Sequence, residues 1–390
     1  MLTLEESAEL TQVGRGTLVG ELLRRYWFPV AASAQLEKEP VIPVELLGEK
    51  LVLFRDNSGK LGLLERACPH RRTSLAYGMA EDSGIRCAYH GWRFDAEGNC
   101  TEQPSEPEGS TYYQKITTPA YPVQELGGLI FGYLGPSPAP LLPRYNVLDW
   151  KKADRDINGT MVPCNWLQVV ENILDPSHIE NLHGRYFGYV LERTDPDEAK
   201  FFKARFKPAP IKHMSFDVFE RGIIERHYTR DETDNTWTTG SPIFFPSTAM
   251  MGRPDRSAGA LILIVPLDDE RTWFIEHRAQ PAQGKAQQSV PFIDVPGTDE
   301  DGEFRIATAN GQDHMVSVTQ GSMAARHLER LGATDTGLIL YRQLLIDQAR
   351  LAADGGDPMG VLRDPSQNKR IDMPVASPQH EQHEVEVAKA

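Results

Sequence analysis

Long apolar runs are absent from this chain of 390 residues. No segment approaches the roughly 20 consecutive apolar residues that a membrane-spanning helix needs, so no membrane partner is expected. The richest apolar run, residues 260–267, is short and contains Pro266, which favours a buried strand. No basic region precedes an apolar segment at the N-terminus, so a secretory signal peptide is not expected either.

Cysteine and positive charge are also scarce. Four cysteines are too few for a disulfide scaffold, and we therefore expect a reduced, cytoplasmic protein. The chain has 41 basic and 55 acidic residues, and its net charge of −14 argues against a nucleic-acid partner. An apolar share of 40% and a charged share of 25% are typical of a globular protein. At about 150 residues per domain, the length predicts two or three domains.

The first part of the chain predicts a helical segment followed by an all-β module. Leucine and valine recur at roughly helical spacing before Trp27. After Pro29 the pattern changes to short strand-like runs with a turn signal at 56–59. This pattern continues until four prolines within 136–143 mark a linker.

The second part predicts a mixed domain. A helix is expected over 166–183, interrupted at Pro176, and two further helices within 320–349, broken near Gly332. Strand-like runs lie between these helices, at 214–228, 236–245, 261–265 and 272–277. We therefore predict a helical segment, a β module, a mixed domain and a polar C-terminal surface arm, at residues 1–27, 28–143, 144–362 and 363–390.

Two cysteines and two histidines form the first candidate metal site. Cys68 and His70 are followed, after 16 intervening residues, by Cys87 and His90, so each half pairs one thiolate with one imidazole. Two sulfurs on one iron and two histidines on the other form the ligand set of a Rieske [2Fe–2S] cluster. Replacing two thiolates by neutral imidazoles raises the potential of the cluster, which suits it to accept electrons.

A structural zinc site is the alternative, because two cysteines and two histidines also satisfy tetrahedral Zn²⁺. Zinc-finger histidines usually share one helix, whereas here each histidine is paired with a cysteine on a β-rich background. The strings C-P-H-R at 68–71 and C-A-Y-H-G-W at 87–92 resemble the ligand loops of Rieske proteins. The two loops hold no additional cysteine pair, and in this respect the chain resembles the oxygenase branch of the Rieske proteins. Cys100 and Cys164 have no assigned role, and we expect them to be buried small hydrophobes.

A second candidate site lies in segment 165–183, which carries His178 and His183 in an H-x4-H pattern. Five residues on an ideal α-helix correspond to a rotation of about 140°, so the two rings share a face only if the helix is bent or bulged. Asp175 lies three residues before His178 and does share a face with it. Two imidazoles and one carboxylate on one face of Fe(II) form the facial triad of non-haem oxygenases, with open positions for O₂ and substrate.

The two sites together resemble those of Rieske non-haem iron oxygenase α subunits, and the resemblance covers nearly the whole chain. The string N-W…E-N-x-x-D-x-x-H-x4-H at 165–183 is similar to the mononuclear iron motif of that family. The resemblance implies that His178 and His183 are iron ligands. It also implies that Asp175 bridges His178 to a cluster histidine, His90, of a neighbouring protomer. A turn or capping carboxylate is the alternative for Asp175.

The resemblance places the third iron ligand far downstream, at Asp313. In the phthalate-dioxygenase-like branch the carboxylate ligand precedes a Ser/Thr-Asp-x-Gly string, and Asp313 stands 21 residues before T-D-T-G at 334–337. Gln320 matches a glutamine of the family pattern, but Val318 stands where the family usually has glutamate. The alternatives are that Asp313 only caps a helix, or that the adjacent His314 completes a three-histidine site.

The resemblance also implies the fold, the cofactors and the partners. The fold class is α+β, with an N-terminal all-β Rieske [2Fe–2S] module and a C-terminal α/β catalytic domain whose central antiparallel sheet is of the helix-grip, START-like type. The cofactors are one Rieske cluster and one mononuclear Fe(II) per chain, with NAD(P)H used indirectly through a flavin and iron–sulfur reductase. A homotrimer or hexamer is expected, because one subunit's cluster lies near the next subunit's iron in this family.

The implied function is that of a terminal oxygenase, which uses O₂ and reductase-supplied electrons to hydroxylate or dihydroxylate an aromatic compound, first of all an aromatic carboxylate. The alternatives are an aromatic O-demethylase or diaryl-ether-cleaving monooxygenase, and a non-catalytic Rieske electron carrier. A substrate carboxylate requires a guanidinium, for which Arg226 is the candidate, with an exposed strand arginine as the alternative. Ser241 and Phe244 are candidates to line an apolar ring pocket, although core packing explains Phe244 equally well.

Overall fold

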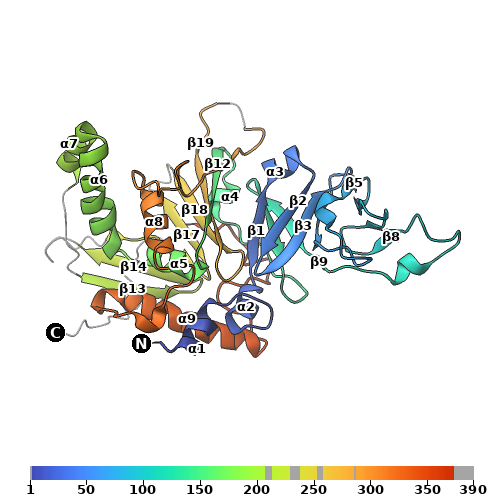
Figure 1. Ribbon diagram of the computed structural model, residues 1–390. Helices are drawn as coiled ribbons and strands as arrows, with labels where there is room; N and C mark the ends of the chain where they lie inside the picture. The colour runs from blue at the N-terminus through green and yellow to red at the C-terminus, as the bar shows by residue number, and fades with distance from the viewer. Residues whose placement is uncertain (1, 207–212, 229–237, 253–257, 285–286, 373–390) are drawn as a thin grey trace.

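The computed structural model describes residues 2–206, 213–228, 238–252, 258–284 and 287–372 (Figure 1). Eleven short strands make up the N-terminal module: β1 (Trp27–Ala32), β2 (Val41–Leu46), β3 (Glu49–Arg55), β4 (Leu61–Glu65), β5 (Met79–Glu81), β6 (Gly84–Arg86), β7 (Arg93–Phe94), β8 (Cys100–Glu102), β9 (Ala120–Tyr121), β10 (Val123–Leu126) and β11 (Leu129–Tyr133). They form three antiparallel sheets with the orders β1-β11-β10, β2-β3-β4-β9 and β5-β6-β7-β8. The predicted turn at 56–59 joins β3 to β4, with Gly59 at a φ of +90°.

The C-terminal domain is built on one nine-stranded sheet. Its strands are β12 (Ala153–Val162), β13 (His213–Phe219), β14 (Gly222–Tyr228), β15 (Thr238–Thr239), β16 (Ile243–Phe244), β17 (Thr248–Gly252), β18 (Gly259–Pro266), β19 (Thr272–Pro281) and β20 (Phe292–Asp294). The order is β13-β14-β16-β17-β18-β19-β12-β20, with β15 paired to β14. Among the described strands of this sheet, the β12–β20 pair is parallel and the other pairs are antiparallel. The apolar run at 260–267 lies in and just after β18, whose last six residues are buried, as expected for a strand covered on both faces.

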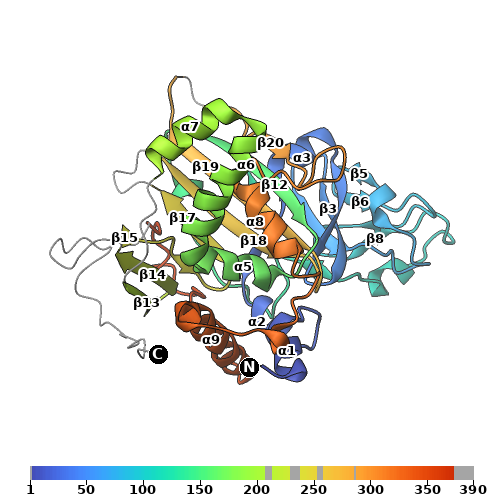
Figure 2. The same ribbon diagram turned by 60° about the vertical axis from the view of Figure 1, so that its left-hand side comes forward.

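Helices pack against the module and against the large sheet. They are α1 (Leu4–Thr11), α2 (Leu18–Leu23), α3 (Ser33–Lys38), α4 (Asn146–Asp149), α5 (Trp166–Leu174), α6 (Phe187–Thr194), α7 (Pro196–Arg205), α8 (Ala309–Val318) and α9 (Thr336–Ala353). Figure 2 shows α5, α6 and α8 on one face of the sheet. The N-terminal α2 packs along α9. No helix among the described residues has the length and apolar content to cross a membrane.

The α+β prediction, with an all-β module followed by a large antiparallel sheet, is confirmed. The prediction of two helices within 320–349 is wrong in its first half, because only short 3₁₀ turns precede Thr336. In this segment Leu328 is 65% exposed, whereas Arg326 is 1% exposed and points inward. The segment before Thr336 is therefore anchored by the buried guanidinium of Arg326 and not by an apolar helix face.

The ends of two other predicted segments differ from expectation or lie outside the described residues. The C-terminal arm was expected at the surface, but Ile371 is buried and forms a bridge with Tyr145. Residues 373–390 of that arm, and residues 236–237 of the predicted strand, lie outside the described parts of the chain.

The module and the domain share one apolar core and several backbone hydrogen bonds. The amides of Leu47 and Gly48 donate to carbonyls at the end of β18, at 2.9 and 2.7 Å. The Nε2 of His277 on β19 donates to the carbonyl of Gly127, in the turn between β10 and β11, at 2.7 Å. A second, smaller core lies under the predicted cluster loops and includes Cys68 and Cys87.

His277 predicts a pH dependence of stability. Burial lowers the pKa of its imidazole to about 4, below the ordinary value of 6.5, so the folded protein binds fewer protons than the unfolded chain between these values. Stability is therefore complete above about pH 6.5 and falls as the pH approaches 4, with a loss of about 2 kcal/mol at pH 5.

The variant His277→Gln keeps an N–H donor for Gly127 but does not titrate. In urea unfolding at pH 7 and pH 5, the wild type should lose about 2 kcal/mol more than this variant. An equal loss in both proteins would contradict the assignment to His277.

Candidate metal centres

The two predicted cluster loops are closed by the same backbone hydrogen bonds. The amide of Cys68 donates to the carbonyl of Thr73, and the amide of Cys87 donates to the carbonyl of Trp92, both at 2.8 Å. The two thiols are 1% and 3% exposed. The loops therefore present two buried sulfurs from equivalent positions, although their sequences differ in the spacing from cysteine to histidine.

In each loop, the fourth residue after the cysteine has a left-handed backbone. Arg72 has a φ of +61° and Gly91 a φ of +74°, and their amides donate to the carbonyls of Cys68 and Cys87 at 2.8 and 3.0 Å. Glycine adopts this conformation freely, whereas a residue with a side chain adopts it at a cost of about 1 kcal/mol or more. The ion pair between Arg72 and Glu65 fixes the less favourable of the two loops. Sequence inspection missed this equivalence.

The imidazoles of the two loops lie side by side nearer the surface. The ring centroids of His70 and His90 are 4.5 Å apart. His70 also stacks on the indole of Trp92, with a centroid distance of 4.3 Å and an interplanar angle of 4°. The stacking holds the His70 ring in place beside His90. The two rings together form one edge of the module, which we call the histidine edge.

The buried sulfurs favour a bound metal. Burial, with a smaller contribution from the neighbouring Cys87, raises the pKa of the Cys68 thiol to about 12. A buried thiolate is stable only with a compensating cation, and a coordinated metal supplies it. This donor set fits an iron–sulfur cluster. Cys100 and Cys164 are free, buried thiols, at 4% and 0% exposure.

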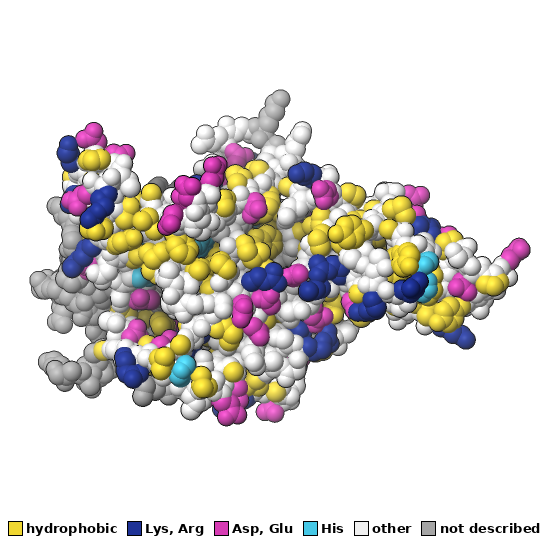
Figure 3. Space-filling model, in the orientation of Figure 1, with side chains coloured by type: hydrophobic (Ala, Val, Ile, Leu, Met, Phe, Trp, Pro, Cys, Tyr) yellow, Lys and Arg dark blue, Asp and Glu magenta, His cyan; other side chains and the backbone are white. Residues whose placement is uncertain are grey.

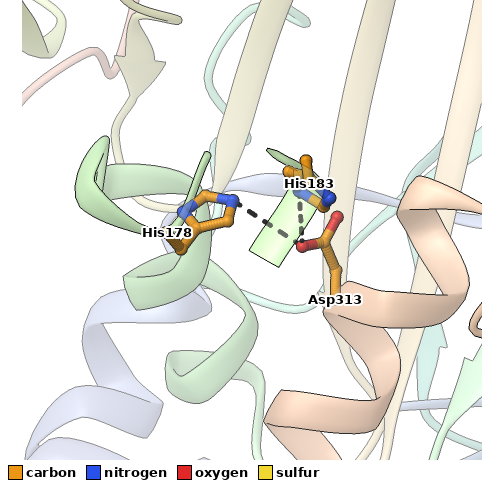
Figure 4. A group of neighbouring side chains, drawn as sticks. All are labelled: His178, His183 and Asp313. Atoms are coloured by element: carbon orange, nitrogen blue, oxygen red, sulfur yellow. Dashed lines mark ion pairs between the residues drawn. The ribbon is translucent and has the colours of Figure 1, made fainter. Parts of the chain in front are cut away.

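Two histidines and one aspartate come together in the second predicted site (Figure 4). His178 and His183 project from the segment after α5, and Asp313 projects from α8. The Nε2 atoms of the two histidines lie 3.7 and 3.1 Å from Oδ1 of Asp313. One ligand atom from each residue lies within 4.8 Å of the other two, a spacing at which one ion can contact all three.

A π-helix resolves the unfavourable spacing of the two histidines. Pro176 ends α5, with Asp175 in an extended conformation, and the chain then forms a π-helix at Ile179–Tyr186. A π-helix has i→i+5 hydrogen bonds, so residues five apart lie above one another. His178 and His183 therefore share a face, and their ring centroids are 5.0 Å apart.

The other ring nitrogen of each histidine is occupied by the protein. The Nδ1 of His178 contacts the backbone carbonyl of Asp175. The Nδ1 of His183 donates to Oε1 of Gln312 at 2.9 Å, and Nε2 of Gln312 donates to the carbonyl of Ile306 at 2.8 Å. Because this amide is fixed from both sides, Nδ1 of His183 donates its proton to Gln312, and Nε2 is the ring nitrogen that faces Asp313. Gln312 was not singled out in the sequence, where only its position next to Asp313 marked it.

Asp313 is not a helix cap. It is the fifth residue of α8, whose N-cap is Thr308. Its Oδ1 accepts from Nδ2 of Asn172 at 3.4 Å, and its hydrogen bond raises the pKa of His183. His314 points elsewhere, since its ring is 6% exposed and packs edge-on against Phe274 at 5.4 Å.

Asp175 borders a cavity of about 520 Å³ beside His178. Its carboxylate accepts from the amide of Ser177 at 2.7 Å, and its carbonyl contacts His178. Asp175 therefore both stabilises a turn and contacts the imidazole of His178. Gln320, two residues after the end of α8, also lines this cavity, and its amide donates to the carbonyl of Val316 in that helix.

A buried ion cluster lies under the same cavity and was missed by sequence inspection. The carboxylate of Glu171 on α5 accepts from Arg326 at 2.8 Å and from Arg342 of α9 at 2.6 Å. Although burial opposes its ionisation, the charges of the two guanidiniums lower the pKa of Glu171. The cluster ties α5 to α9 and to the irregular segment between α8 and α9.

The predicted substrate residues do not meet at this site. Arg226 is 7% exposed, and its Nε lies 3.0 Å from Asp217 of the neighbouring strand β13. Phe244 packs edge-on against Tyr145 and Phe219, at 5.2 and 5.6 Å. Ser241 is half-buried. Among the described residues, neither these side chains nor their contacts line the cavity beside His178, so their substrate role stays a prediction.

Two family models match the chain, and they follow each other along the sequence in the same order as the two candidate metal sites. The Rieske [2Fe-2S] domain matches residues 26–122, which contain both cysteine–histidine loops. The vanillate O-demethylase oxygenase C-terminal domain matches residues 162–275, which contain His178 and His183. The first match identifies an iron–sulfur domain in place of the zinc alternative.

Curated relatives cover nearly the whole chain. The 5,5'-dehydrodivanillate O-demethylase oxygenase subunit of Sphingobium sp. is 38% identical over 96% of this chain and 87% of its own. The phenoxybenzoate dioxygenase subunit alpha of Ectopseudomonas oleovorans is 35% identical over 90% and 87%. The phthalate 4,5-dioxygenase oxygenase subunit of Pseudomonas putida is 31% identical over 93% and 89%.

Solved structures show the same fold at low identity. Pseudomonas putida CBB5 NdmA with bound caffeine, as a QL mutant, has a TM-score of 0.64 at 18% identity, covering 88% of this chain and 97% of that one. The oxygenase of carbazole 1,9a-dioxygenase, in complex with ferredoxin, has a TM-score of 0.61 at 19% identity, covering 85% and 93%. Together with the two metal sites, these similarities show that the chain belongs to the Rieske non-haem iron oxygenases and is a terminal oxygenase subunit with a Rieske [2Fe–2S] domain and a mononuclear iron domain.

Proposed function

We propose that this terminal oxygenase inserts oxygen into a methoxylated aromatic compound and thereby O-demethylates it. The match of residues 162–275 to the vanillate O-demethylase C-terminal domain carries this choice. The 38% identical relative is also named for O-demethylation. Hydroxylation or dihydroxylation of the ring of an aromatic carboxylate is the second candidate, favoured by the relatives named for phenoxybenzoate and phthalate dioxygenases.

We assign the metal ligands from the geometry of the two sites. The proposed cluster ligands are Cys68, His70, Cys87 and His90. The proposed Fe(II) ligands are His178, His183 and Asp313. The buried, equivalent sulfurs support the first set, and the three converging ligand atoms support the second.

When bound, the cluster supplies single electrons and the mononuclear iron activates O₂. The protein holds the ligands in place for this chemistry. Gln312 keeps the proton on Nδ1 of His183, and the carbonyl of Asp175 does the same for His178. His178, His183 and Asp313 would hold this ion through three protein ligands, and its remaining positions would be available to O₂ and the substrate.

We propose that electrons pass between neighbouring protomers. Terminal oxygenases of this family work with a separate electron-transfer protein and assemble as oligomers. In one chain, the β5-β6-β7-β8 end of the module projects away from α5 and α8 (Figures 1 and 2). A homotrimer or hexamer, in which His90 of one protomer faces Asp175 of the next, brings the two centres together. The proposed donor is a flavin and iron–sulfur reductase that uses NAD(P)H.

The protein purified without oxygen should be brown, show a Rieske-type EPR signal after reduction and contain about three irons per chain. With a methoxylated aromatic acid, O₂ and a reductase, it should release one formaldehyde per substrate consumed. A ring diol without formaldehyde would favour dihydroxylation instead. A colourless protein that contains zinc would exclude both reactions.

Asp175→Asn should keep both metals yet lose most of its turnover. Asparagine retains the side-chain oxygen that accepts from Ser177, so the turn stays intact while the negative charge is removed. Iron content and the EPR signal report the metals, and product formation reports turnover. Normal product formation at full iron content would reject a role of this carboxylate in electron transfer.

Gln312→Leu should weaken Fe(II) binding by about 10–100-fold, because His183 loses the acceptor that fixes its tautomer. Fe(II) titration of the chelator-treated protein measures this without any turnover. Gln320→Leu is the matched control, since within the described residues the Gln320 amide donates to the carbonyl of Val316 and to neither histidine. Equal affinities in the two variants would show that Gln312 does not position His183.

A further inference from the structure

A groove of about 1010 Å³ lies on the side of the module, next to the first cluster loop. Ala67 and Ser74, which pair across the base of that loop, contribute to its wall. Arg72, at the left-handed position of the loop, also lines the groove. The backbone of the loop therefore runs from this surface directly to Cys68 and His70.

The groove is basic although the protein is acidic. Its charged lining comprises four basic and two acidic side chains, Arg15, Lys50, Arg66, Arg72, Glu49 and Glu65. The whole chain, by contrast, carries a net charge of −14. Figure 3 shows dark blue side chains where the module meets the rest of the molecule.

The two acidic side chains in the groove are already neutralised. Glu49 accepts from Arg15 at 2.8 Å, from Arg24 at 3.0 Å and from Tyr121 at 2.6 Å. Glu65 is paired with Arg72. Lys50 is exposed on β3 and has no ion pair within the described residues. Arg66 is paired with Glu45 at 3.4 Å, so the uncompensated positive charge of the groove comes from Lys50 and from the Arg15–Glu49–Arg24 group, in which two guanidiniums share one carboxylate.

The histidine edge of the cluster serves a different contact. Under the proposed function, on which this inference rests, His90 faces Asp175 of a neighbouring protomer and passes electrons out. An electron donor must then reach the cluster from another side, and the groove beside Arg72 is a basic surface that adjoins a ligand loop.

We propose that this groove docks an acidic protein domain that carries a one-electron donor. On docking, one electron leaves the reduced donor and enters the oxidised cluster, so the donor is oxidised by one electron and the cluster is reduced by one. Two such transfers match the two electrons that NAD(P)H gives to the reductase. Charge complementarity steers the approach of the acidic domain and makes its binding sensitive to salt.

The test uses a plant-type [2Fe–2S] ferredoxin, an acidic one-electron carrier, as the probe of the full-length holoprotein. Its dissociation constant is measured by calorimetry with both proteins oxidised, at about 0.05 M and about 0.5 M salt. Stopped flow then gives the rate at which the reduced probe reduces the Rieske cluster. Both measurements are independent of any substrate.

Lys50→Glu should weaken binding at low salt by about tenfold and slow cluster reduction similarly, with most of the difference lost at high salt. Arg15→Gln should act in the same direction, because Arg24 and Tyr121 still neutralise Glu49. Lys151→Glu is the matched control, with the same change of charge at an exposed residue outside the groove.

Equal weakening in Lys50→Glu and Lys151→Glu would overturn the proposal, because net charge alone would then explain the effect. Unchanged binding in both groove variants, or no binding of the probe to the wild type at low salt, would overturn it too. A protein without a Rieske-type EPR signal would refute the proposed function itself, whereas a normal signal with unaffected binding refutes only the docking site.

Discussion

The backbone between α5 and α6 is the constraint on which the iron site depends. Pro176 cannot continue α5, and the π-helix that follows changes the angular spacing of the side chains. Only with that spacing do His178 and His183 face the same carboxylate, at 3.7 and 3.1 Å from Asp313. In a regular α-helix the second imidazole would be rotated by about 140° away from the first. The π-helix at Ile179–Tyr186 is locally unfavourable, and the packing around it maintains it.

That packing includes a buried carboxylate between two guanidiniums. Glu171 joins α5 to Arg326 and to Arg342 of α9, and it lies beside the cavity that reaches Asp175 and His178. A buried ion pair adds little net stability, yet removing one partner costs about 3–5 kcal/mol, because it leaves an uncompensated charge. The cluster consequently fixes the relative positions of three segments more than it strengthens the fold.

The module is fixed just as firmly, and this determines how the two centres can communicate. His277, Leu47 and Gly48 join the module to the large sheet, and in this arrangement the β5-β6-β7-β8 end of the module lies away from α5 and α8 of its own chain (Figures 1 and 2). The module therefore offers its two sides to other molecules. The proposed contacts use both of them, the histidine edge for a neighbouring protomer and the basic groove beside Arg72 for an electron donor.

The sequence by itself determined the α+β class and the order of the two centres, and it singled out the candidate ligand residues. Metal ligands are chemically distinctive, and the spacing of Cys68–His70 and Cys87–His90 is short enough to read locally. The π-helix, the tautomer-fixing role of Gln312 and the ion cluster at Glu171 required the tertiary structure. Each depends on partners far away in the chain, such as the contact between His183 and residue 312, which no local pattern encodes. The segment before α9 was mistaken for a helix for the same reason, since its inward residue is a charge whose partner lies on α5.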